Sequence, residues 1–379
     1  MRPIRSSPST DQVPPRGARR VPGRDADASG ASTDTRVDRW IATPGGELAF
    51  TVAGSGQAVV LIHGLGGDRH TWRHLIGPLS RHRTVIALDL PGHGDSAAPA
   101  GGYSPGSHAA AVRDLMVALG IPRASLVGHS LGGGIAVQFA YQFPDRTERV
   151  ALISSGGFGV EVTPLLRGAR LPGAEALLSV VGRVPRFVTR SALAVTAVVS
   201  GLVARDDATP VSNDLRGMAD PRRRHGFVST ARAVMDLRGQ TALATPYLHA
   251  LVDLPILLAW GSDDRVIPPS QHSELARTLP AHQVVEILGA GHYPHETAAD
   301  QLLPPLERFL TATEPFQYAD PSRARRFDEP AYSWEPESGA GHVPEGGPRR
   351  SSGQPQTATD ALADSICSPI SVSRLRPSA

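Results

Sequence analysis

The sequence has 379 residues, of which 40% are hydrophobic and 20% are charged, and its formal net charge is +2. Every basic side chain is arginine, and these arginines form no continuous run with interleaved aromatic residues, so the charge does not indicate nucleic-acid binding. The single cysteine, Cys367, excludes an intramolecular disulfide, and no cluster of residues resembles a zinc site. We therefore expect neither a nucleic-acid partner nor a metal.

The two ends of the chain differ in composition from its middle. Residues 1–36 and 314–379 are rich in Pro, Gly, Ser and charged residues, so they bury too little apolar surface to offset the entropy cost of ordering. We expect an N-terminal tail over 1–36 and a mostly disordered C-terminal tail over 314–379. Aromatic residues in the second tail indicate that part of it lies against the folded domain: Phe316, Tyr318, Phe327, Tyr332 and Trp334. The first residues contain arginine but no apolar segment of a secretory signal, which favours a cytoplasmic location.

Two apolar runs near the start of the middle region, 58–62 and 84–88, predict β-strands. Each is followed by a loop rich in glycine and polar residues. The first loop reads His63-Gly64-Leu65-Gly66-Gly67, and the second reads Asp89-Leu90-Pro91-Gly92-His93-Gly94-Asp95-Ser96.

The next motif is a G-x-S-x-G pentapeptide, Gly128-His129-Ser130-Leu131-Gly132. It follows the apolar run 124–127 and precedes the small-residue stretch 132–140, an order that predicts strand, sharp turn and helix. A serine at the tip of such a turn is held in a strained conformation with its hydroxyl exposed. Because the flanking glycines let strand and helix pack closely, Ser130 is a candidate nucleophile.

A serine nucleophile needs a base and a group that orients the base, and the chain supplies candidates downstream. The apolar run 254–259 predicts a strand, and the polar turn Trp260-Gly261-Ser262-Asp263-Asp264 follows it. A further strand over 284–288 leads to Gly289-Ala290-Gly291-His292. Because the carboxyl ends of parallel strands share one edge of a sheet, an aspartate of this turn and His292 are expected to converge with Ser130.

These five motifs, in this order, resemble the α/β-hydrolase superfamily, in particular its cap-bearing branch, over residues 37–313. The resemblance implies an α/β fold with a mostly parallel central sheet flanked by helices and a helical cap insertion. It places the core at 37–156 and 252–313 and the cap at 157–251. The insertion lacks strand alternation, and we expect helices at 174–181, 190–203 and 230–238, separated by Pro185, Pro210 and Pro221.

The resemblance also assigns roles to residues. Ser130 resembles the nucleophile, His292 the general base, and Asp264 the carboxylate that orients His292. The W-G-x-x-D pattern of the turn selects Asp264 over its neighbour Asp263. Backbone N–H groups of Leu65 and Leu131 correspond to the oxyanion hole. No metal and no organic cofactor is implied.

The expected activity is hydrolysis of a carboxylic ester or related acyl compound through an acyl-serine intermediate. Epoxide hydrolases and haloalkane dehalogenases use aspartate at the position of Ser130, which argues against both. Hydrolysis of a C–C bond, acyl transfer and perhydrolysis on the same triad remain alternatives, as does a non-catalytic ligand-binding protein. The loop His63-Gly64-Leu65-Gly66-Gly67-Asp68 differs from the H-G-x-G-P-G loop of many C–C hydrolases.

The expected partner is a small molecule with an apolar acyl or alkyl portion. Apolar cap residues 192–203 are expected to roof its pocket. The segment has about 13 apolar residues, too few for a transmembrane helix of roughly 20 residues. Arginines around it leave interfacial membrane contact as the alternative interpretation: Arg183, Arg186, Arg190 and Arg205.

Overall fold

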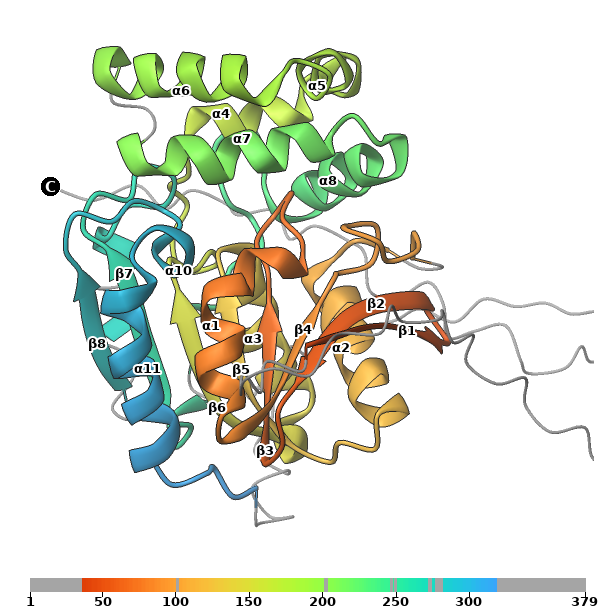
Figure 1. The fold of residues 1–379 in the computed structure, drawn as a ribbon, viewed down its shortest axis with the longest axis vertical. Helices are drawn as coiled ribbons and strands as arrows, with labels where there is room; N and C mark the ends of the chain where they lie inside the picture. Colours follow the sequence, from red (N-terminus) through yellow and green to blue (C-terminus); the bar gives the residue numbers. More distant parts are fainter. Residues whose placement is uncertain are drawn as a thin grey trace, which may run out of the picture. The chain divides into compact units, whose positions relative to one another are not determined.

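The computed structural model describes residues 36–99, 102–200, 204–245, 248, 251–271, 275–276 and 282–318 (Figure 1). The expectations for the tails over 1–35 and 319–379, including Phe327, Tyr332, Trp334 and Cys367, lie outside the described residues.

An eight-stranded sheet forms the centre of the described region, in the order β1-β2-β4-β3-β5-β6-β7-β8. The strands are β1 (Val37–Thr43), β2 (Gly46–Ala53), β3 (Gln57–Ile62), β4 (Arg83–Leu88), β5 (Ala124–His129), β6 (Thr147–Ile153), β7 (Ile256–Gly261) and β8 (His282–Ile287). β2 pairs antiparallel with both β1 and β4, whereas all pairs from β4 to β8 are parallel. This mostly parallel sheet confirms the predicted α/β class.

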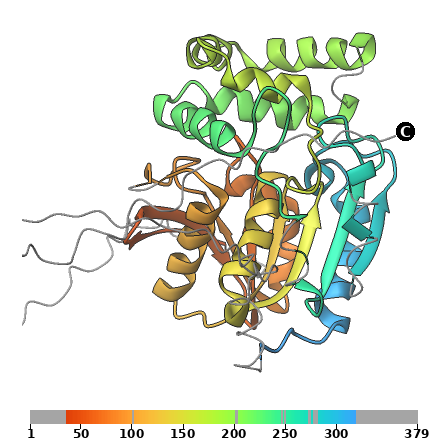
Figure 2. The same ribbon diagram turned by 180° about the vertical axis from the view of Figure 1, so that it is seen from behind.

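Helices cover both faces of the sheet (Figures 1 and 2). They are α1 (Arg73–Ser80), α2 (Pro105–Ala118), α3 (Leu131–Gln142), α10 (Pro294–Thr297) and α11 (Ala299–Ala312). Alternate residues of each central strand point to opposite faces: Val60 and Ile62 of β3 pack with the apolar residues of α2 and α3, whereas Val59 and Leu61 pack with those of α1 and α11. Burial on both faces explains the unbroken apolar runs of these strands.

The cap lies over the carboxyl end of the sheet and is helical, as expected (Figure 2). It contains α4 (Pro164–Arg167), α5 (Ala174–Val181), α6 (Arg186–Ser200), α7 (Ala208–Gly217) and α8 (Pro221–Val234), with short 3-10 turns η3 (Gly168–Arg170) and η4 (Arg205–Asp207). The bounds of α5 match the prediction. The helix expected over 190–203 begins earlier, and α7 was not predicted.

The prolines explain these differences. Pro221 is the first residue of α8, after the cap Asp220, whose side chain accepts the N–H groups of Arg222 and Arg223. Pro210 likewise lies in the first turn of α7. The first N–H groups of a helix have no intrahelical acceptor, so a proline there breaks no hydrogen bond. These prolines begin helices, whereas the sequence analysis placed them between helices.

The described part of the C-terminal region, residues 314–318, follows α11 along the core. The Phe316 N–H donates to Glu148 O at 2.9 Å, and its ring packs against the apolar residues on the α2–α3 face of the sheet. The Arg123 guanidinium donates to Phe316 O. Phe316 therefore lies against the domain, as its aromatic character predicted.

Candidate active site

Ser130 occupies the sharp turn between β5 and α3. Its φ of 53° and ψ of −119° lie outside the regions that non-glycine residues prefer. The backbone around it holds this conformation: its N–H donates to Ile153 O at 3.0 Å, and its carbonyl accepts the N–H groups of Gly133 and Gly156. The strained turn expected for Ser130 is therefore present.

The glycines on either side of Ser130 allow β5 and α3 to approach closely. A Cβ on Gly128 would lie 2.2 Å from the carbonyl oxygen of Gly132, and a Cβ on Gly132 would lie 2.1 Å from that of Ile62. No side chain fits at either position without moving backbone. The packing reason given for these two glycines in the pentapeptide is confirmed.

Asp264 and His292 meet at the carboxyl ends of β7 and β8. The His292 Nδ1 lies 2.8 Å from Asp264 Oδ2, and both side chains are buried. The other oxygen of Asp264 accepts the N–H groups of Val266 and Ile267 at 2.8 and 2.9 Å, which fixes the carboxylate. Asp263 is exposed. The geometry therefore joins His292 to Asp264, the residue that the W-G-x-x-D pattern selected.

A second carboxylate, which the sequence analysis missed, contacts the backbone of His292. Asp207 of the cap turn η4 is fully buried, and its two oxygens accept the N–H groups of His292 at 2.7 Å and Tyr293 at 3.2 Å. Gly291 leaves room for this approach, because a Cβ there would lie 2.3 Å from Asp207 Oδ2. No local motif marks Asp207, since the contact spans 85 residues of sequence.

The two carboxylates set the electrostatics of His292. Burial acts to lower the pKa of His292, but Asp264 and, less strongly, Asp207 raise it above the usual 6.5. Burial raises the pKa of Asp207 itself to about 6, although the N–H groups that it accepts oppose this. An imidazole whose protonated form is stabilised in this way can accept a proton from a nearby hydroxyl.

Aromatic and histidine rings pack around His292. His129, the variable residue of the pentapeptide, lies with Nε2 at 2.8 Å from the His292 carbonyl oxygen. Its ring centroid is 4.8 Å from that of His292 and 4.2 Å from that of His295. His295 is buried and lies with Nε2 at 2.8 Å from Thr71 Oγ1. Both therefore support the His292 loop.

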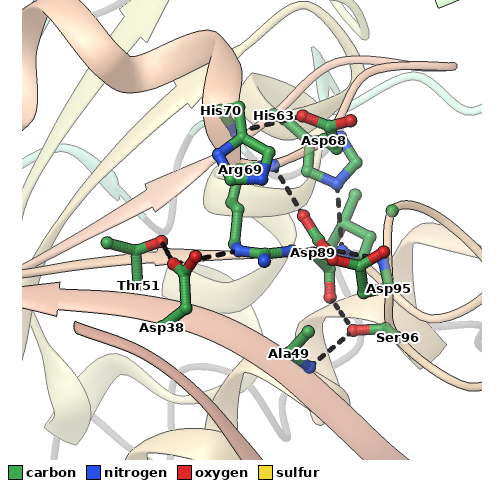
Figure 3. Close-up of polar contacts among 12 residues, drawn as sticks. Asp38, Ala49, Thr51, His63, Asp68, Arg69, His70, Asp89, Asp95 and Ser96 are labelled. Carbon is green, nitrogen blue, oxygen red and sulfur yellow. Dashed lines mark hydrogen bonds and ion pairs between the residues drawn. The ribbon is translucent and has the colours of Figure 1, made fainter. Parts of the chain in front are cut away.

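The loop that carries Leu65 is fixed by the buried side chains of Figure 3. The Leu90 N–H donates to His63 Nε2 at 3.0 Å, so His63 ties the loop after β3 to the loop after β4. Asp89 accepts the Arg69 N–H at 2.6 Å and the Asp95 N–H at 2.7 Å, and it forms an ion pair with the Arg69 guanidinium. His63 is thus a structural anchor of this loop.

The backbone N–H groups of Leu65 and Leu131 are available as donors. Leu131 is the first residue of α3, where N–H groups have no intrahelical acceptor. Among the described residues, the Leu65 N–H has no hydrogen-bond acceptor either. Both residues line a cavity with Ser130.

This cavity has a volume of about 50 Å³ and lies between core and cap. Its lining residues are mainly apolar: Leu65, Pro105, Ser130, Leu131, Gly156, Gly157, Val162, Leu166, Val234, Met235, Gln240, Ala242 and Ile267. None of the described residues of α6 is among them, so residues 192–196 do not roof the pocket as expected, whereas the side chains of 197–199 and residues 201–203 lie outside the described part of the chain. The cap residues that line it come from the α4 region, the end of α8 and the segment after α8, because α6 packs on α7 instead.

The structure brings the three predicted side chains to the same edge of the sheet. The Asp264–His292 pair is formed, and His129, next to Ser130 in the chain, contacts His292. Within the described residues no hydrogen bond joins Ser130 Oγ to His292. Such contacts are often long before substrate binds.

The order of the motifs and the fold are shared with known proteins. The profile described as alpha/beta hydrolase fold matches residues 57–299, which covers most of the sheet, the cap and the segments that carry Ser130, Asp264 and His292. This chain belongs to the alpha/beta hydrolase fold family. The strand order of the sheet and the helical insertion α5–α8 are those of an α/β-hydrolase fold with a cap.

Three relatives illustrate the range of this family. An uncharacterized protein of Mycobacterium tuberculosis is 38% identical over 71% of this chain and 80% of its own length. The 2-hydroxy-6-oxo-2,4-heptadienoate hydrolase of Pseudomonas putida is 28% identical over 69% of this chain and 92% of its own. A solved thermophilic esterase from Thermogutta terrifontis is 27% identical, with a TM-score of 0.56 over 73% of this chain and 98% of its own.

Proposed function

We propose that this α/β-hydrolase cleaves a carboxylic ester or related acyl compound with Ser130, His292 and Asp264 as catalytic triad. The observation that carries the proposal is the buried Asp264–His292 pair at 2.8 Å, at the same sheet edge as a serine held at positive φ. A serine nucleophile requires an imidazole base that a carboxylate holds in the correct orientation.

The proposed reaction has two steps. Ser130 Oγ attacks the carbonyl carbon while His292 Nε2 takes the hydroxyl proton, and the N–H groups of Leu65 and Leu131 stabilise the oxyanion. The intermediate collapses, His292 gives its proton to the leaving alcohol, and an acyl-serine remains. Water then attacks the acyl-serine as His292 takes its proton. The bond between the acyl carbon and Ser130 Oγ breaks, His292 returns the proton to Ser130 Oγ, and the acid is released.

The direct test is labelling with a fluorophosphonate, measured by intact mass. Wild-type protein is expected to gain one adduct, and Ser130→Ala none. Ser155→Ala is the matched control. Ser155 is also buried, and it lies beside Gly133 of α3, the helix that follows Ser130. A folded wild-type protein that gains no adduct would favour the non-catalytic binding protein.

The cavity size supports a small apolar acyl group. About 50 Å³ is far below the roughly 300–1,000 Å³ of pockets that hold drug-sized ligands. We expect kcat/KM for p-nitrophenyl esters to be highest for acetate to butyrate and to fall with longer chains. Leu166→Ala shortens a side chain that lines the cavity and so enlarges it, and we expect the optimum to shift to longer acyl chains. An unchanged profile would contradict this assignment of the cavity.

C–C bond hydrolysis is the second candidate, because a relative named as a 2-hydroxy-6-oxo-2,4-heptadienoate hydrolase aligns over most of this chain. Loss of the coloured ring-cleavage substrate, followed by absorbance, measures this activity directly. Turnover of that substrate without hydrolysis of any ester would contradict the ester proposal and support C–C bond hydrolysis. Acyl transfer and perhydrolysis on the same triad are separated from hydrolysis by product analysis with competing alcohol or peroxide.

A further inference from the structure

The outer helices of the cap expose large apolar side chains. α5 and α6 lie on the side of the cap away from the sheet (Figures 1 and 2). Phe187 is 71% exposed, Leu177 and Val180 are each 65% exposed, and Val195 is 62% exposed. None of these four residues lines the cavity beside Ser130, so contact with a molecule bound in that cavity does not account for their exposure.

Arginines accompany this apolar surface. Arg183, Arg186, Arg190 and Arg216 line a recess of about 780 Å³ between α6 and the end of α7, beside Phe187, and none of its described lining residues is acidic. Within the part of the chain that the structure describes, none of these four arginines forms an ion pair. Their charge is therefore available to a partner.

Exposed apolar side chains beside unpaired cations are the combination that binds a bilayer rich in anionic lipid. We propose that the outer face of α5 and α6, with this arginine recess, docks on such a membrane surface. Contact is peripheral, because no described helix is both long and apolar enough to cross a bilayer. A symmetric contact between two copies is disfavoured, since a two-fold axis at this face would bring like charges together.

Phe187 and Val195 would enter the boundary between headgroups and acyl chains. On a helical wheel these positions lie about 80° apart, with Ser191 between them, so they share the outward face of α6. Arg190 lies next to Phe187 around the helix and would meet the phosphate groups. Apolar insertion and charge attraction together provide the two contributions that stable peripheral binding requires.

Sedimentation with vesicles tests the proposal on the full chain. We expect binding to vesicles of phosphatidylcholine with about a third phosphatidylglycerol, weakened by salt, and little binding to phosphatidylcholine alone. Each arginine near such a surface contributes about fivefold to the partition coefficient, so Arg186→Gln with Arg190→Gln is expected to reduce that coefficient about 25-fold. Phe187→Ser with Val195→Ser is expected to reduce it at least roughly tenfold.

Matched controls lie on the core. Leu288→Ser removes a side chain that is 69% exposed, and Arg81→Gln removes an exposed arginine. Both are expected to bind as wild type, and circular dichroism melting verifies that all variants fold. Equal loss in controls and cap variants, equal binding to neutral vesicles, or no binding would overturn the proposal. A dimer by light scattering that Phe187→Ser dissociates, without vesicle binding, would assign the face to a second copy.

Discussion

Asp264 and Asp263 are adjacent in the chain but have different surroundings. The Asp264 carboxylate is held by two N–H groups and by His292, whereas Asp263 is exposed. Asp264→Asn keeps an oxygen for the N–H groups of Val266 and Ile267, so the fold is expected to persist. Because the amide no longer orients and stabilises the imidazolium, kcat is expected to fall about 10³- to 10⁴-fold.

The control for that experiment is Asp263→Asn, which is expected to change kcat less than about twofold because surface substitutions perturb little. Steady-state kinetics on a short p-nitrophenyl ester measures both. Equal losses in the two variants, or a larger loss in Asp263→Asn, would reverse the assignment of the carboxylate.

The pH dependence of activity follows from the pair formed by Asp264 and His292. Asp264 and Asp207 raise the pKa of His292 above 6.5 against the effect of burial, and only neutral imidazole can take the Ser130 proton. We therefore expect kcat/KM to fall as pH decreases through an inflection above 6.5. Asp264→Asn removes the main group that opposes the effect of burial on the pKa of His292. The inflection of the residual activity is therefore expected at lower pH. An inflection that does not move would contradict this origin.

Sequence motifs selected Ser130, Asp264 and His292 as candidates because each lies at a strand end within a recognisable local pattern. The sequence also predicted β3, β4, β5, β7 and β8 to within about two residues, and in all of these but the partly exposed β8 burial on both faces explains the continuous apolar run. β1 and β2 were not predicted, and β1 is mostly exposed, so it carries no such run. Asp207 could not be found in this way, because it has an ordinary cap sequence and its partner is 85 residues away. Such a contact is created only by the packing of cap on core.

At the scale of elements, the turn η4 links the cap to the loop that carries His292. Asp207→Ala leaves the N–H groups of His292 and Tyr293 buried without acceptors, at a cost of roughly 1–3 kcal/mol each. We expect a loss of about 2–4 kcal/mol in the free energy of unfolding and at least roughly a tenfold lower kcat, because the imidazole is less well positioned.

Asp207→Asn separates the two effects. Its amide oxygen can still accept one N–H, so it is expected to be more stable than Asp207→Ala while the negative charge behind His292 is lost. Asp206→Ala is the control, because Asp206 is adjacent and exposed. Urea unfolding and steady-state kinetics measure both quantities; wild-type values in Asp207→Ala would show that the cap contact is dispensable.

Cap helices were harder to predict than strands. A proline in the first turn of a helix and a proline between helices look the same in a sequence, so α7 was missed and the start of α8 was placed too late. The surroundings of α6 were also wrongly expected: an apolar helix indicates burial only if something covers it, and Phe187 and Val195 are exposed. Which face of a cap helix meets the core is decided by tertiary packing.

At the scale of the whole molecule, buried histidines are a source of acid sensitivity. Burial lowers the pKa of five histidines in the core: His63, His93, His108, His129 and His295, with that of His108 at about 4. Each therefore binds a proton less readily in the folded state than in the unfolded chain. Their contribution to stability is therefore present above pH 6.5 and is lost as pH falls.

Other buried groups act in the opposite direction. Burial raises the pKa values of Asp207 and Asp214, so the folded state keeps protons that the unfolded chain releases above about 3.8. Two carboxyl groups and the raised pKa of His292 offset only part of the effect of five histidines. Between pH 6 and pH 5 the unfolded chain is therefore expected to bind more protons than the folded one.

This difference predicts that the free energy of unfolding decreases as the pH falls through that interval. Urea unfolding at pH 7, 6 and 5 measures it. His108→Gln removes one of the five histidines, whose pKa is about 4 in the folded state, and is expected to reduce the slope by about 1 kcal/mol per pH unit. A stability that is flat or rises towards pH 5 would mean that these histidines are protonated in the folded protein, and that the core opens to water around them.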